Sequence, residues 1–507
     1  MPSLGPLALA LYLSTSLALP APPQIPLSSA RSDAKVLILG GGMAGITAAR
    51  TLHDQGIDDF IVVEARHEVG GRMLSHTFGE PGRQYTVELG ANWVQGTRHD
   101  DGPENPVWTL AKKHHLDTRL SSYFEGLATF DEDGPVNYTD VIEAASRNFD
   151  KLIASAGARL PKSLVDASAR TGYSLTGSRP QTPHEHAAEY YHFDWEFQSS
   201  PEETSWLASS WNNNSTFFTF SEQNAMSVDG RGFKTILQSE ARSFLREDQI
   251  RLNATVDLIS YSDDGVEVRL TDGQTLSADH VICTFSLGVL QHDDVHFEPP
   301  LPMWKREAIY SMTMGVYTKI FLQFPYKFWF DTEIALYADR ERGRYPIWQS
   351  LDDPDFFPGS GILLTTVTNA FSRRIVSLPK DQILDELLDV LGTMYPNITI
   401  PAPTDFHFKS WDEDPLFRGS YANWPPSFLE EKHANLRADV KRRVWFAGEA
   451  GSKLYFGYLQ GAYFEGRHVA MKVTSCVQGS REACVGFEHV KNVKNTRPYD
   501  IDYEVSV

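Results

Sequence analysis

The chain is poor in cysteine and in basic residues. It has 3 cysteines among 507 residues, and 46 Lys and Arg against 66 Asp and Glu, which gives a formal net charge of −20. The acid excess argues against nucleic acid as a partner, because neutralising phosphates requires clustered Lys and Arg. An acidic surface could attract cations toward a cleft, although a contribution to solubility alone is the simpler explanation.

The cysteines allow one disulfide at most within the chain. Cys476 and Cys484 are close in sequence and could form it in an oxidising compartment, whereas Cys283 lies in the apolar run VICTF and is expected to be an inert core thiol. No internal repeat is visible.

Long apolar runs are also scarce at the start of the chain. The run LGPLALALYLSTSLALPAPP is too short and too interrupted to span a bilayer, and it ends in small residues and prolines. We therefore expect a cleaved signal peptide at residues 1–20 and no stable membrane insertion, with a membrane-anchored N-terminus as the alternative. The C-terminus EVSV carries no SKL or KDEL-type address. Secretion agrees with five glycosylation sequons, at Asn137, Asn213, Asn214, Asn253 and Asn397.

The most informative pattern lies in residues 35–72. A β-type run, Val36–Leu39, enters a glycine-rich turn, a helical run follows, and a second β-type run, Phe60–Val63, ends at Glu64. This order is typical of a dinucleotide-binding unit, although an ordinary strand-to-helix turn is the alternative. The helix N-terminus would offer unpaired N–H groups to the phosphates, and Glu64 would accept hydrogen bonds from ribose hydroxyls.

Three glycines of the turn have separate roles in this pattern. Gly40 permits the tight turn, Gly42 lets the backbone approach the pyrophosphate, and Gly45 lets the helix pack closely on the strand. The residues expected to contact the dinucleotide here are Gly40, Gly42, Met43, Ala44, Gly45, Glu64, Ala65 and Arg66.

A second glycine loop indicates which kind of dinucleotide cofactor the chain binds. Gly70-Gly71-Arg72 follows the second strand, and a flexible loop carrying a guanidinium suits another pyrophosphate contact. The run EARHEVGGRMLS followed by ELGANWVQG (Glu88–Gly96) resembles the flavin-containing amine oxidases, and within them the polyamine oxidases of the secreted plant type. The resemblance extends from about residue 35 to 485.

The resemblance implies an α/β fold in which two discontinuous domains interleave. One is a Rossmann-like FAD-binding domain (GR2-type), and the other is an α+β substrate domain that covers the reactive end of the flavin. We assign residues 35–115, 223–310 and 430–475 to the FAD-binding domain, 116–222 and 311–429 to the substrate domain, and 476–507 to a C-terminal tail.

Local patterns predict several elements directly. The runs ATVDLISYS and GVEVRLTDG predict two strands joined by an Asp-Asp-Gly turn. GVYTKIFLQF (Gly315–Phe324) predicts an alternating strand, and DQILDELLDVLGTMY predicts an amphipathic helix.

Lys319 lies in the middle of the alternating strand, on the same face as Tyr317. A lysine inside an apolar strand is costly unless it is exposed or partnered, so a surface lysine on a half-buried strand is the alternative. In the family the lysine of this strand reaches flavin N5 through a water. The resemblance therefore implies that Lys319 acts on a proton or on oxygen at the flavin.

Two tyrosines lie in further family motifs, Tyr458 in GYLQGAY and Tyr421 in RGSYANWP. The resemblance implies that their rings stand over the flavin and fix the amine between them, whereas packing in the core is the alternative. It also implies that Glu449 contacts the ribityl–phosphate region and that the backbone of Val256 holds the adenine. The remaining implied cofactor contacts are Gly71, Arg72, Gly90, Ala91, Asn92, Trp93, Val256, Trp424, Glu449, Tyr458 and Leu459.

Two positions depart from relatives within the family. Ser420 stands where monoamine oxidases carry the cysteine that bonds the flavin, so FAD should be held non-covalently. Gln95 stands where the plant polyamine oxidases carry a glutamate. The neutral amide lacks the negative charge that would pair with a substrate ammonium. The second family acid corresponds to Glu196, with Phe197 beside it, although Glu196 could equally be a solvated helix carboxylate.

The sequence therefore predicts a secreted FAD-dependent amine oxidase of polyamine oxidase type. Its partners would be a small amine and O2, with catalytic residues Lys319, Tyr421 and Tyr458 and substrate contacts Gln95, Glu196, Phe197 and Tyr317. One alternative is an oxidase of another amine, such as an amino acid, which would require a pocket arginine. A second alternative, from a different class of protein, is a nucleotide-binding protein without catalytic activity. No metal site is expected, and oligomeric state is not predicted.

Overall fold

The structure is a computed structural model that describes residues 33–99, 101–121, 126–159, 165–426, 430–479 and 484–487. The described residues belong to one compact unit. The predicted signal peptide and most of the predicted C-terminal tail lie outside them. The assigned domain boundaries stay a prediction.

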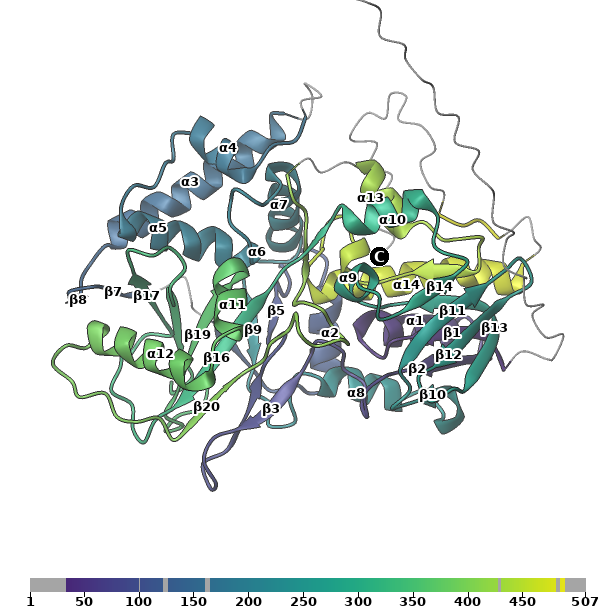
Figure 1. Ribbon diagram of the computed structural model, residues 1–507, viewed down its shortest axis with the longest axis horizontal. Coiled ribbons are helices and arrows are strands. Elements are labelled where there is room, and N and C mark those ends of the chain that lie inside the picture. The colour runs from purple at the N-terminus through teal and green to yellow at the C-terminus, as the bar shows by residue number, and fades with distance from the viewer. Residues whose placement is uncertain are drawn as a thin grey trace, which may run out of the picture. The chain divides into compact units, whose positions relative to one another are not determined.

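The first large sheet has the strand order β10-β2-β1-β13-β12-β11-β14, and β22 also pairs with β13 (Figure 1). Its centre is parallel, as expected for Val/Ile/Leu-rich strands buried on both faces, while β12 runs antiparallel to β11 and β13. Its strands are β1 (Ala34–Leu39), β2 (Phe60–Val63), β10 (Ile250–Arg251), β11 (Val256–Tyr261), β12 (Val266–Leu270), β13 (Thr275–Cys283), β14 (His296–Glu298) and β22 (Val444–Phe446).

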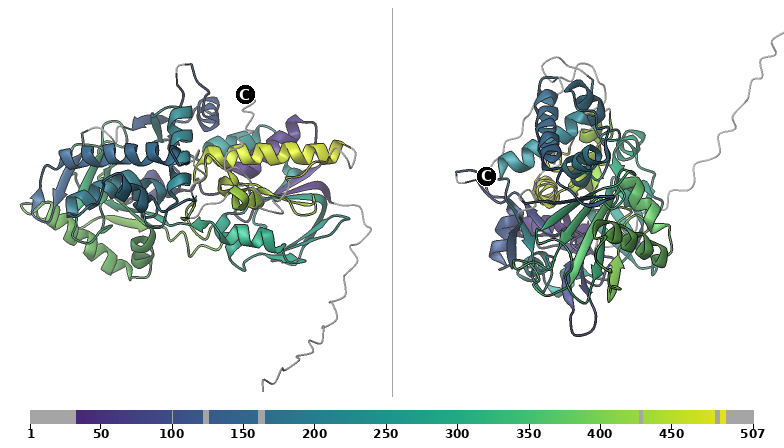
Figure 2. Two further views of the ribbon diagram at one scale, coloured as in Figure 1. Left: turned by 90° about the horizontal axis from the view of Figure 1, so that it is seen from above. Right: turned by 90° about the vertical axis from the view of Figure 1, so that its left-hand side faces the viewer.

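Successive residues of β1 face two different cores. Val36 and Ile38 pack with four helices, whereas Leu37 and Leu39 pack with β11, β12 and the helix α10 (Met303–Tyr310). Figure 2 shows α14, the long yellow helix, lying along the purple and teal segments of this sheet. The four helices are α1 (Met43–Asp54), α2 (Pro106–Lys113), α8 (Thr235–Arg242) and α14 (Leu459–Gln478).

The second large sheet has the order β20-β16-β19-β18-β17-β7-β8 and is antiparallel except for the β17–β7 pair. Helix α12 (Lys380–Met394) packs its buried leucine and isoleucine face on β16, and α11 (Asn369–Val376) follows β19 directly. The strands are β7 (Ala128–Asp131), β8 (Gly134–Pro135), β16 (Tyr317–Gln323), β17 (Ile334–Ala338), β18 (Ile347–Ser350), β19 (Ile362–Thr368) and β20 (Asp405–Phe408).

A helical region connects β8 to β9. Three of its elements, α5, the π-helix η2 and α6, form one continuous helical run that ends at Gln198 in the left-handed conformation, with φ of 51°. The elements are α3 (Thr139–Gly157), α4 (Ala169–Leu175), α5 (Pro183–Glu189), η2 (Tyr190–Asp194), α6 (Trp195–Phe197), α7 (Trp206–Asn213) and the π-helix η3 (Asn214–Phe218).

Three small sheets and several short helices complete the described chain. The sheets are β3 (Ser75–Phe78) with β4 (Tyr85–Glu88), β5 (Trp93–Gln95) with β9 (Asn224–Ser227) and β6 (Thr118–Ser121), and β15 (Thr313–Met314) with β21 (Ala422–Asn423). The helices are α9 (Leu287–Gln291), α13 (Glu430–Arg437) and the 3₁₀ turns η4 (Glu247–Gln249) and η5 (Glu449–Gly451).

The locally predicted elements are confirmed, with one correction. β1, β2, β11, β12, β16 and α12 all form where the patterns placed them. The expected alternation of β16 is wrong, however, because every residue after Tyr317 is buried. β16 lies between β19 and β20 with α12 on one face and a second apolar cluster on the other, so neither face is left to water.

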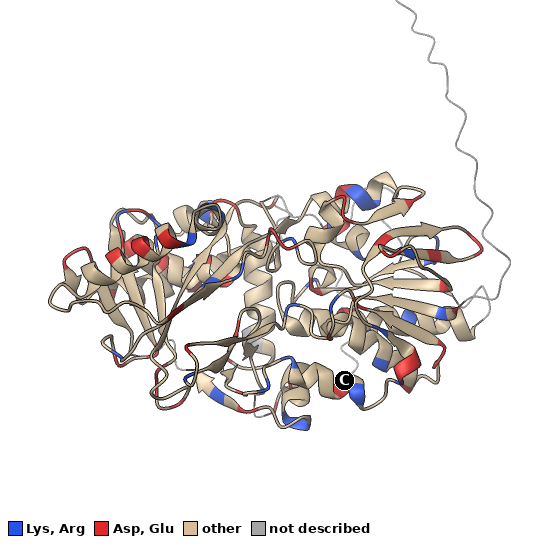
Figure 3. Cartoon of the chain, turned by 60° about the horizontal axis from the view of Figure 1, so that its bottom comes forward, with Lys and Arg blue, Asp and Glu red and all other residues tan. Residues whose placement is uncertain are grey.

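The predicted disulfide is confirmed: Cys476 at the end of α14 is bonded to Cys484. Cys283 is buried, as expected, and burial raises the pKa of its thiol to about 12. Among the described helices, none combines the length and apolar character that crossing a membrane requires. Figure 3 shows the acidic positions spread over helices and loops with basic positions among them, so the negative charge is not concentrated in one element.

Candidate active site

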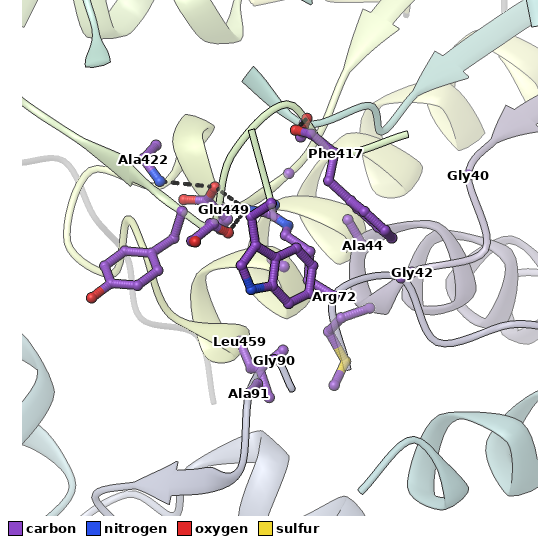
Figure 4. A pocket seen from close by; sticks show the side chains of 18 of the residues that line it. Gly40, Gly42, Ala44, Arg72, Gly90, Ala91, Phe417, Ala422, Glu449 and Leu459 are labelled. Atoms are coloured by element: carbon purple, nitrogen blue, oxygen red, sulfur yellow. Dashed lines mark hydrogen bonds and ion pairs between the residues drawn. The ribbon is translucent and has the colours of Figure 1, made fainter. Parts of the chain in front are cut away.

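A cavity of about 550 Å³ runs from the β1–α1 turn to β16 and the start of α14. Figure 4 shows side chains from the glycine turn, the Arg72 loop and the Glu449 turn facing it. It falls within the usual volume range of small-molecule and cofactor sites.

The glycine turn adopts the geometry that the sequence predicts. Gly40 has a φ of 109°, which favours glycine, and its N–H bonds the carbonyl of Val63 at the end of β2. A Cβ on Gly45 would lie 1.9 Å from the carbonyl oxygen of Gly40, so only glycine lets α1 start here. Gly42 is the N-cap of α1 and makes no side-chain cap, so the first N–H groups of the helix have no side-chain partner, and Gly42, Met43 and Ala44 line the cavity.

Glu64 also lies where the pattern places it. Its carboxylate accepts hydrogen bonds from the backbone N–H of Gly41, at 2.6 Å, and of Arg66, at 2.8 Å. Burial raises the pKa of Glu64 above its ordinary value, and these backbone hydrogen bonds oppose that shift. The Glu64 side chain is thus fixed at the end of β2, where it lines the cavity.

The second glycine loop touches the first. A Cβ on Gly71 would lie 3.0 Å from the Cα of Gly42, and both glycines line the cavity. Arg72 donates to the carbonyl of Ser420 at 2.7 Å and to Glu449 at 2.9 Å. Arg72 therefore joins this loop to the β21 region.

Glu449 links three segments. Besides Arg72, it accepts hydrogen bonds from the backbone N–H of Ala422, at 3.3 Å (Figure 4), and of Gly457, at 2.7 Å. It is 5% exposed and lines the cavity. Its carboxylate orders the wall before any ligand is present, which is how a rigid binding site is built.

These features fit a dinucleotide. The uncapped N-terminus of α1 supplies free N–H groups and a positive dipole end for a pyrophosphate. The glycines at positions 42 and 71 leave the backbone open to the cavity, where a side chain would fill the space. The carboxylate of Glu64 and the backbone at Val256 lie on the same cavity.

Lys319 is buried, which excludes the surface alternative. It is 5% exposed, and its ammonium donates to the carbonyls of Glu88, at 3.2 Å, and Gly90, at 2.6 Å, and to the amide oxygen of Asn92, at 2.7 Å. Burial lowers the pKa of Lys319 to about 7, and the negative charge of Glu88 opposes the shift. The amine can therefore lose or gain a proton near neutral pH.

Two tyrosine hydroxyls meet Glu196. Tyr458 donates to its carboxylate, and Tyr421 donates to its backbone carbonyl at 3.0 Å. Burial raises the pKa of Glu196, and the hydrogen bond from Tyr458 opposes the shift. The side chain lines the cavity, so the solvated alternative is excluded and a protein-held carboxylate faces any ligand.

Aromatic rings surround this carboxylate. The ring of Tyr421 lies 6.0 Å from that of Tyr317, and its edge contacts Gly457, where a Cβ would lie 3.1 Å away. Phe197 is buried and lines the same wall. Gln95 lines the cavity from β5, and its side-chain amide makes no hydrogen bond within the described part of the chain. It is therefore available to a ligand.

The cavity gathers nearly all of the sequence-predicted site residues. The exceptions are Gly45, whose contact is with Gly40, and Trp424, which is buried in the core below the first sheet with its carbonyl bonded to Ser205. The contact of Trp424 with the cofactor stays a prediction, and Trp424 lies outside the cavity lining. Lining residues that the sequence analysis missed include Trp195, Asn212, Thr284, Phe285, Ser286, Asp294, Trp411 and Phe417.

Some of the missed residues carried a usable signal. Ser286 follows the apolar run of β13 and caps α9 through the N–H of Val289, so it stands where a parallel strand ends. Trp411 carried none, because only the fold brings its loop against Gly90.

The charges of the lining are mostly paired. Asp294 binds Arg418, Glu449 binds Arg72, and Glu64 is held by backbone N–H groups. Among the described lining residues, Glu196 is the carboxylate whose partner is a neutral phenol. A cation entering the cavity therefore finds Glu196 free of a competing guanidinium or ammonium.

The comparisons with known proteins agree with this site. The chain matches the family described as flavin containing amine oxidoreductase over residues 43–474, and it belongs to that family. It is an oxidoreductase with a flavin cofactor that acts on amines.

The chain is similar to particular plant enzymes within this family. It is 36% identical to polyamine oxidase 1 of Zea mays, over 94% of this chain and 97% of the maize protein. It is 34% identical to polyamine oxidase 7 of Oryza sativa subsp. japonica, over 91% and 99% of the two chains. A solved structure of putrescine oxidase bound to putrescine shares the fold, with a TM-score of 0.67 at 18% identity, over 87% of this chain and 98% of that chain. The predicted fold class is confirmed.

Proposed function

We propose that the protein oxidises a C–N bond of polyamines, namely spermine, spermidine or their acetylated forms. The product would be an imine, which water converts to an aldehyde and an amine, while O2 is reduced to H2O2. The observation that carries the proposal is the Glu196 carboxylate, held by Tyr458 and Tyr421 in one cavity with buried Lys319. The similarity to plant polyamine oxidases supports it.

Each residue of the site has a physical task in this reaction. When bound, FAD supplies the acceptor of the hydride equivalent and its return to O2. Glu196 attracts an ammonium group, and the rings of Tyr317, Tyr421 and Tyr458 on the same cavity offer aromatic faces that favour a cationic nitrogen. Lys319 can take or give a proton near neutral pH, because burial lowers its pKa.

An amino acid substrate is disfavoured by the lining. It would need a cationic partner for its carboxylate, and the arginines that line the cavity in the described residues are Arg66 and Arg72. Arg66 binds Glu68 and the carbonyl of Gly71, and Arg72 binds Glu449. Both guanidinium groups are therefore committed to the protein.

The test is an anaerobic screen of the purified yellow protein. Spermine, spermidine, N-acetylated forms, putrescine and a set of amino acids are added separately, and loss of flavin absorbance and later peroxide release are recorded. Bleaching by polyamines supports the proposal. Bleaching by amino acids alone would reject it in favour of an amino acid oxidase. Absence of bleaching with every amine would reject it in favour of a nucleotide-binding protein without catalysis.

Gln95→Glu is expected to change the preference among these amines. A carboxylate on the cavity wall would pair with a further ammonium, so kcat/KM for spermine should rise about 10-fold relative to an acetylated amine. The measurement is the ratio of the two kcat/KM values, with Gln95→Met as the neutral control. An unchanged ratio in Gln95→Glu would show that this wall does not meet the substrate.

We further propose that FAD is held non-covalently. The Ser420 hydroxyl is engaged with the backbone of Tyr317, accepting from its N–H at 2.8 Å and donating to its carbonyl at 3.2 Å. Acid precipitation of the holoprotein should leave essentially all of the yellow colour in the supernatant. Colour retained in the washed pellet would contradict the proposal.

Secretion also stands as a proposal. The Cys476–Cys484 disulfide is compatible with an oxidising compartment. Of the sequon asparagines, Asn137, Asn214, Asn253 and Asn397 are exposed, as glycosylation requires. Mass spectrometry of the protein from its native source would detect glycans at these positions.

A further inference from the structure

Glu196 lies at the end of a helical run that is held from its outer side by charged residues. The run passes from α5 through the π-helix η2 to α6, and π-helical turns are frequent at functional sites. Asp194 and Glu196 are two positions apart, so their side chains leave the helix in different directions. Glu196 lines the cavity, whereas Asp194 is 4% exposed and points into an ion-pair network.

Arg342 reaches this run from the loop between β17 and β18. Its guanidinium donates to Asp194 at 2.5 Å, pairs with Glu189 at 3.1 Å, and donates to the carbonyl of His186 at 3.3 Å. It also lies over the ring of Tyr190, 6.0 Å from the ring centroid. One side chain thus contacts the last turn of α5 and both ends of η2.

Arg170 on α4 binds the run before Glu196 and the turn that follows the run. It holds Glu189 through both carboxylate oxygens, with one distance of 2.7 Å, and it donates to Glu202 at 2.6 Å. The segment from 189 to 202 is therefore fastened before and after the residue that faces the cavity. Charge-assisted contacts of this kind have a defined geometry and so fix orientation.

The network is also connected to the aromatic wall. The Tyr190 hydroxyl forms a hydrogen bond with the Thr368 hydroxyl, at 2.8 Å, and accepts one from the backbone N–H of Thr368, at 3.0 Å. Thr368 is the register partner of Tyr317, which lines the cavity. A rotation of η2 would therefore move Glu196 relative to both Tyr317 and Tyr458.

We propose that the Arg342–Asp194 pair is a positioning element for amine binding, which holds η2 and α6 so that the Glu196 carboxylate meets both Tyr458 and the substrate nitrogen. The proposal rests on the proposed function, in which Glu196 binds the amine. When Asp194 loses its charge, the charge-assisted hydrogen bond to Arg342 weakens, η2 gains freedom, and the amine binds less tightly.

The electrostatics make this element sensitive to pH. Burial raises the pKa of Asp194 to about 7; Arg342 and Arg170 oppose this shift, and Glu189 and Glu202 add to it. The folded value lies above the ordinary value of 3.8, so the native state binds the extra proton between about pH 4 and 7. This group therefore lowers the free energy of unfolding as pH rises through that window. The ionised pair contributes orientation rather than stability.

The experiment compares Asp194→Asn with the wild-type holoenzyme. The amide keeps the shape but removes the charge, and Arg342 keeps Glu189 as a partner. Rapid anaerobic mixing with spermidine gives the apparent Kd and the limiting rate of flavin bleaching. At pH 8 the Kd of the variant should be about 10-fold higher, with the limiting rate within about 2-fold. At pH 6, where wild-type Asp194 is protonated, the two Kd values should converge.

Two further variants keep the test decisive. Arg342→Lys retains the positive charge but loses the planar guanidinium that donates to several partners at once. This variant should raise Kd at pH 8 by a smaller factor than Asp194→Asn. It should also move the inflection of Kd to higher pH. Asp339→Asn is the matched control, because Asp339 pairs with Arg344, 3.0 Å away, on the same loop. It should leave Kd unchanged.

Three results would overturn the inference. They are an unaltered Kd in Asp194→Asn at pH 8, an equal effect of Asp339→Asn, and a gap that persists at pH 6. If Asp194→Asn does not fold, an unmoved inflection in Arg342→Lys has the same force. Failure of the proposed function looks different, because the wild-type protein would then not bleach with any polyamine.

Discussion

Lys319→Met is expected to slow turnover of the best amine by about 100-fold or more, the range in which a positioned acid or base contributes to catalysis. The ammonium of Lys319 donates to two carbonyls and an amide oxygen at the cavity, and methionine fills similar space without a proton to transfer. Flavin reduction under anaerobic conditions and reoxidation by O2 should be timed separately by rapid mixing. The two rates then show whether flavin reduction, reoxidation or both require the Lys319 side chain.

A second buried lysine serves as the control for this variant. Lys305 on α10 is fully buried and donates to the carbonyls of Asn435, Leu436 and Ala438 at the end of α13, outside the cavity lining. Lys305→Met should lower thermal stability while the surviving holoprotein keeps its rates. A Lys319→Met protein with wild-type rates in both half-reactions would show that this lysine is structural.

The pH dependence follows from the same group. Since burial lowers the pKa of Lys319 to about 7, its neutral fraction grows as pH rises through 7. If the neutral amine is the active form, the limiting rate at saturating substrate rises through an inflection near pH 7, and Lys319→Met lacks that inflection. Titration of Asp194 is distinguishable from titration of Lys319, because it changes the Kd of the amine and not the limiting rate.

Glu196→Gln is expected to weaken binding of cationic amines by about 10- to 100-fold, because a hydrogen bond to a charged group is replaced by one to a neutral amide. The Glu196 carboxylate is bonded to the neutral phenol of Tyr458, and the other described lining carboxylates are held by their own partners, so no neighbour compensates for its loss. The Kd from anaerobic bleaching is the measurement.

Glu185→Gln is the matched control for this change. Glu185 lies on α5, in the helical run that carries Glu196, and glutamine can keep its role in the capping box with Thr182. Its Kd should equal that of the wild type. Equal Kd values for Glu196→Gln and the wild type would place the amine elsewhere in the cavity.

The sequence predicted the parts of the site that depend on local spacing. The turn at Gly40 and Gly42, the strand ending at Glu64 and the strand around Lys319 follow from periodicity and glycine placement within short windows. Sequence could not show that β16 is covered on both faces, because the covering elements come from distant segments.

Contacts across long separations were beyond sequence reasoning. The expected contact of Arg72 with the pyrophosphate stays a prediction, and no local pattern could show that its guanidinium binds Glu449, which lies 377 positions later. The bond between Tyr458 and Glu196 spans 262 positions. Trp424 was grouped with its cofactor-binding neighbours because its motif is continuous, but Ala422 and Asn423 line the cavity whereas Trp424 is buried in the core cluster.

The contact between α1 and α14 ties the two halves of the cavity together. A Cβ on Gly466 would lie 2.2 Å from the carbonyl oxygen of Ala44, so the two helix backbones touch. α1 begins at the glycine turn and α14 begins at Tyr458. The position of the glycine turn and the position of Tyr458 are therefore coupled through this helix contact. A mutation that shifts either helix to accommodate a new ligand will change both cofactor binding and substrate binding.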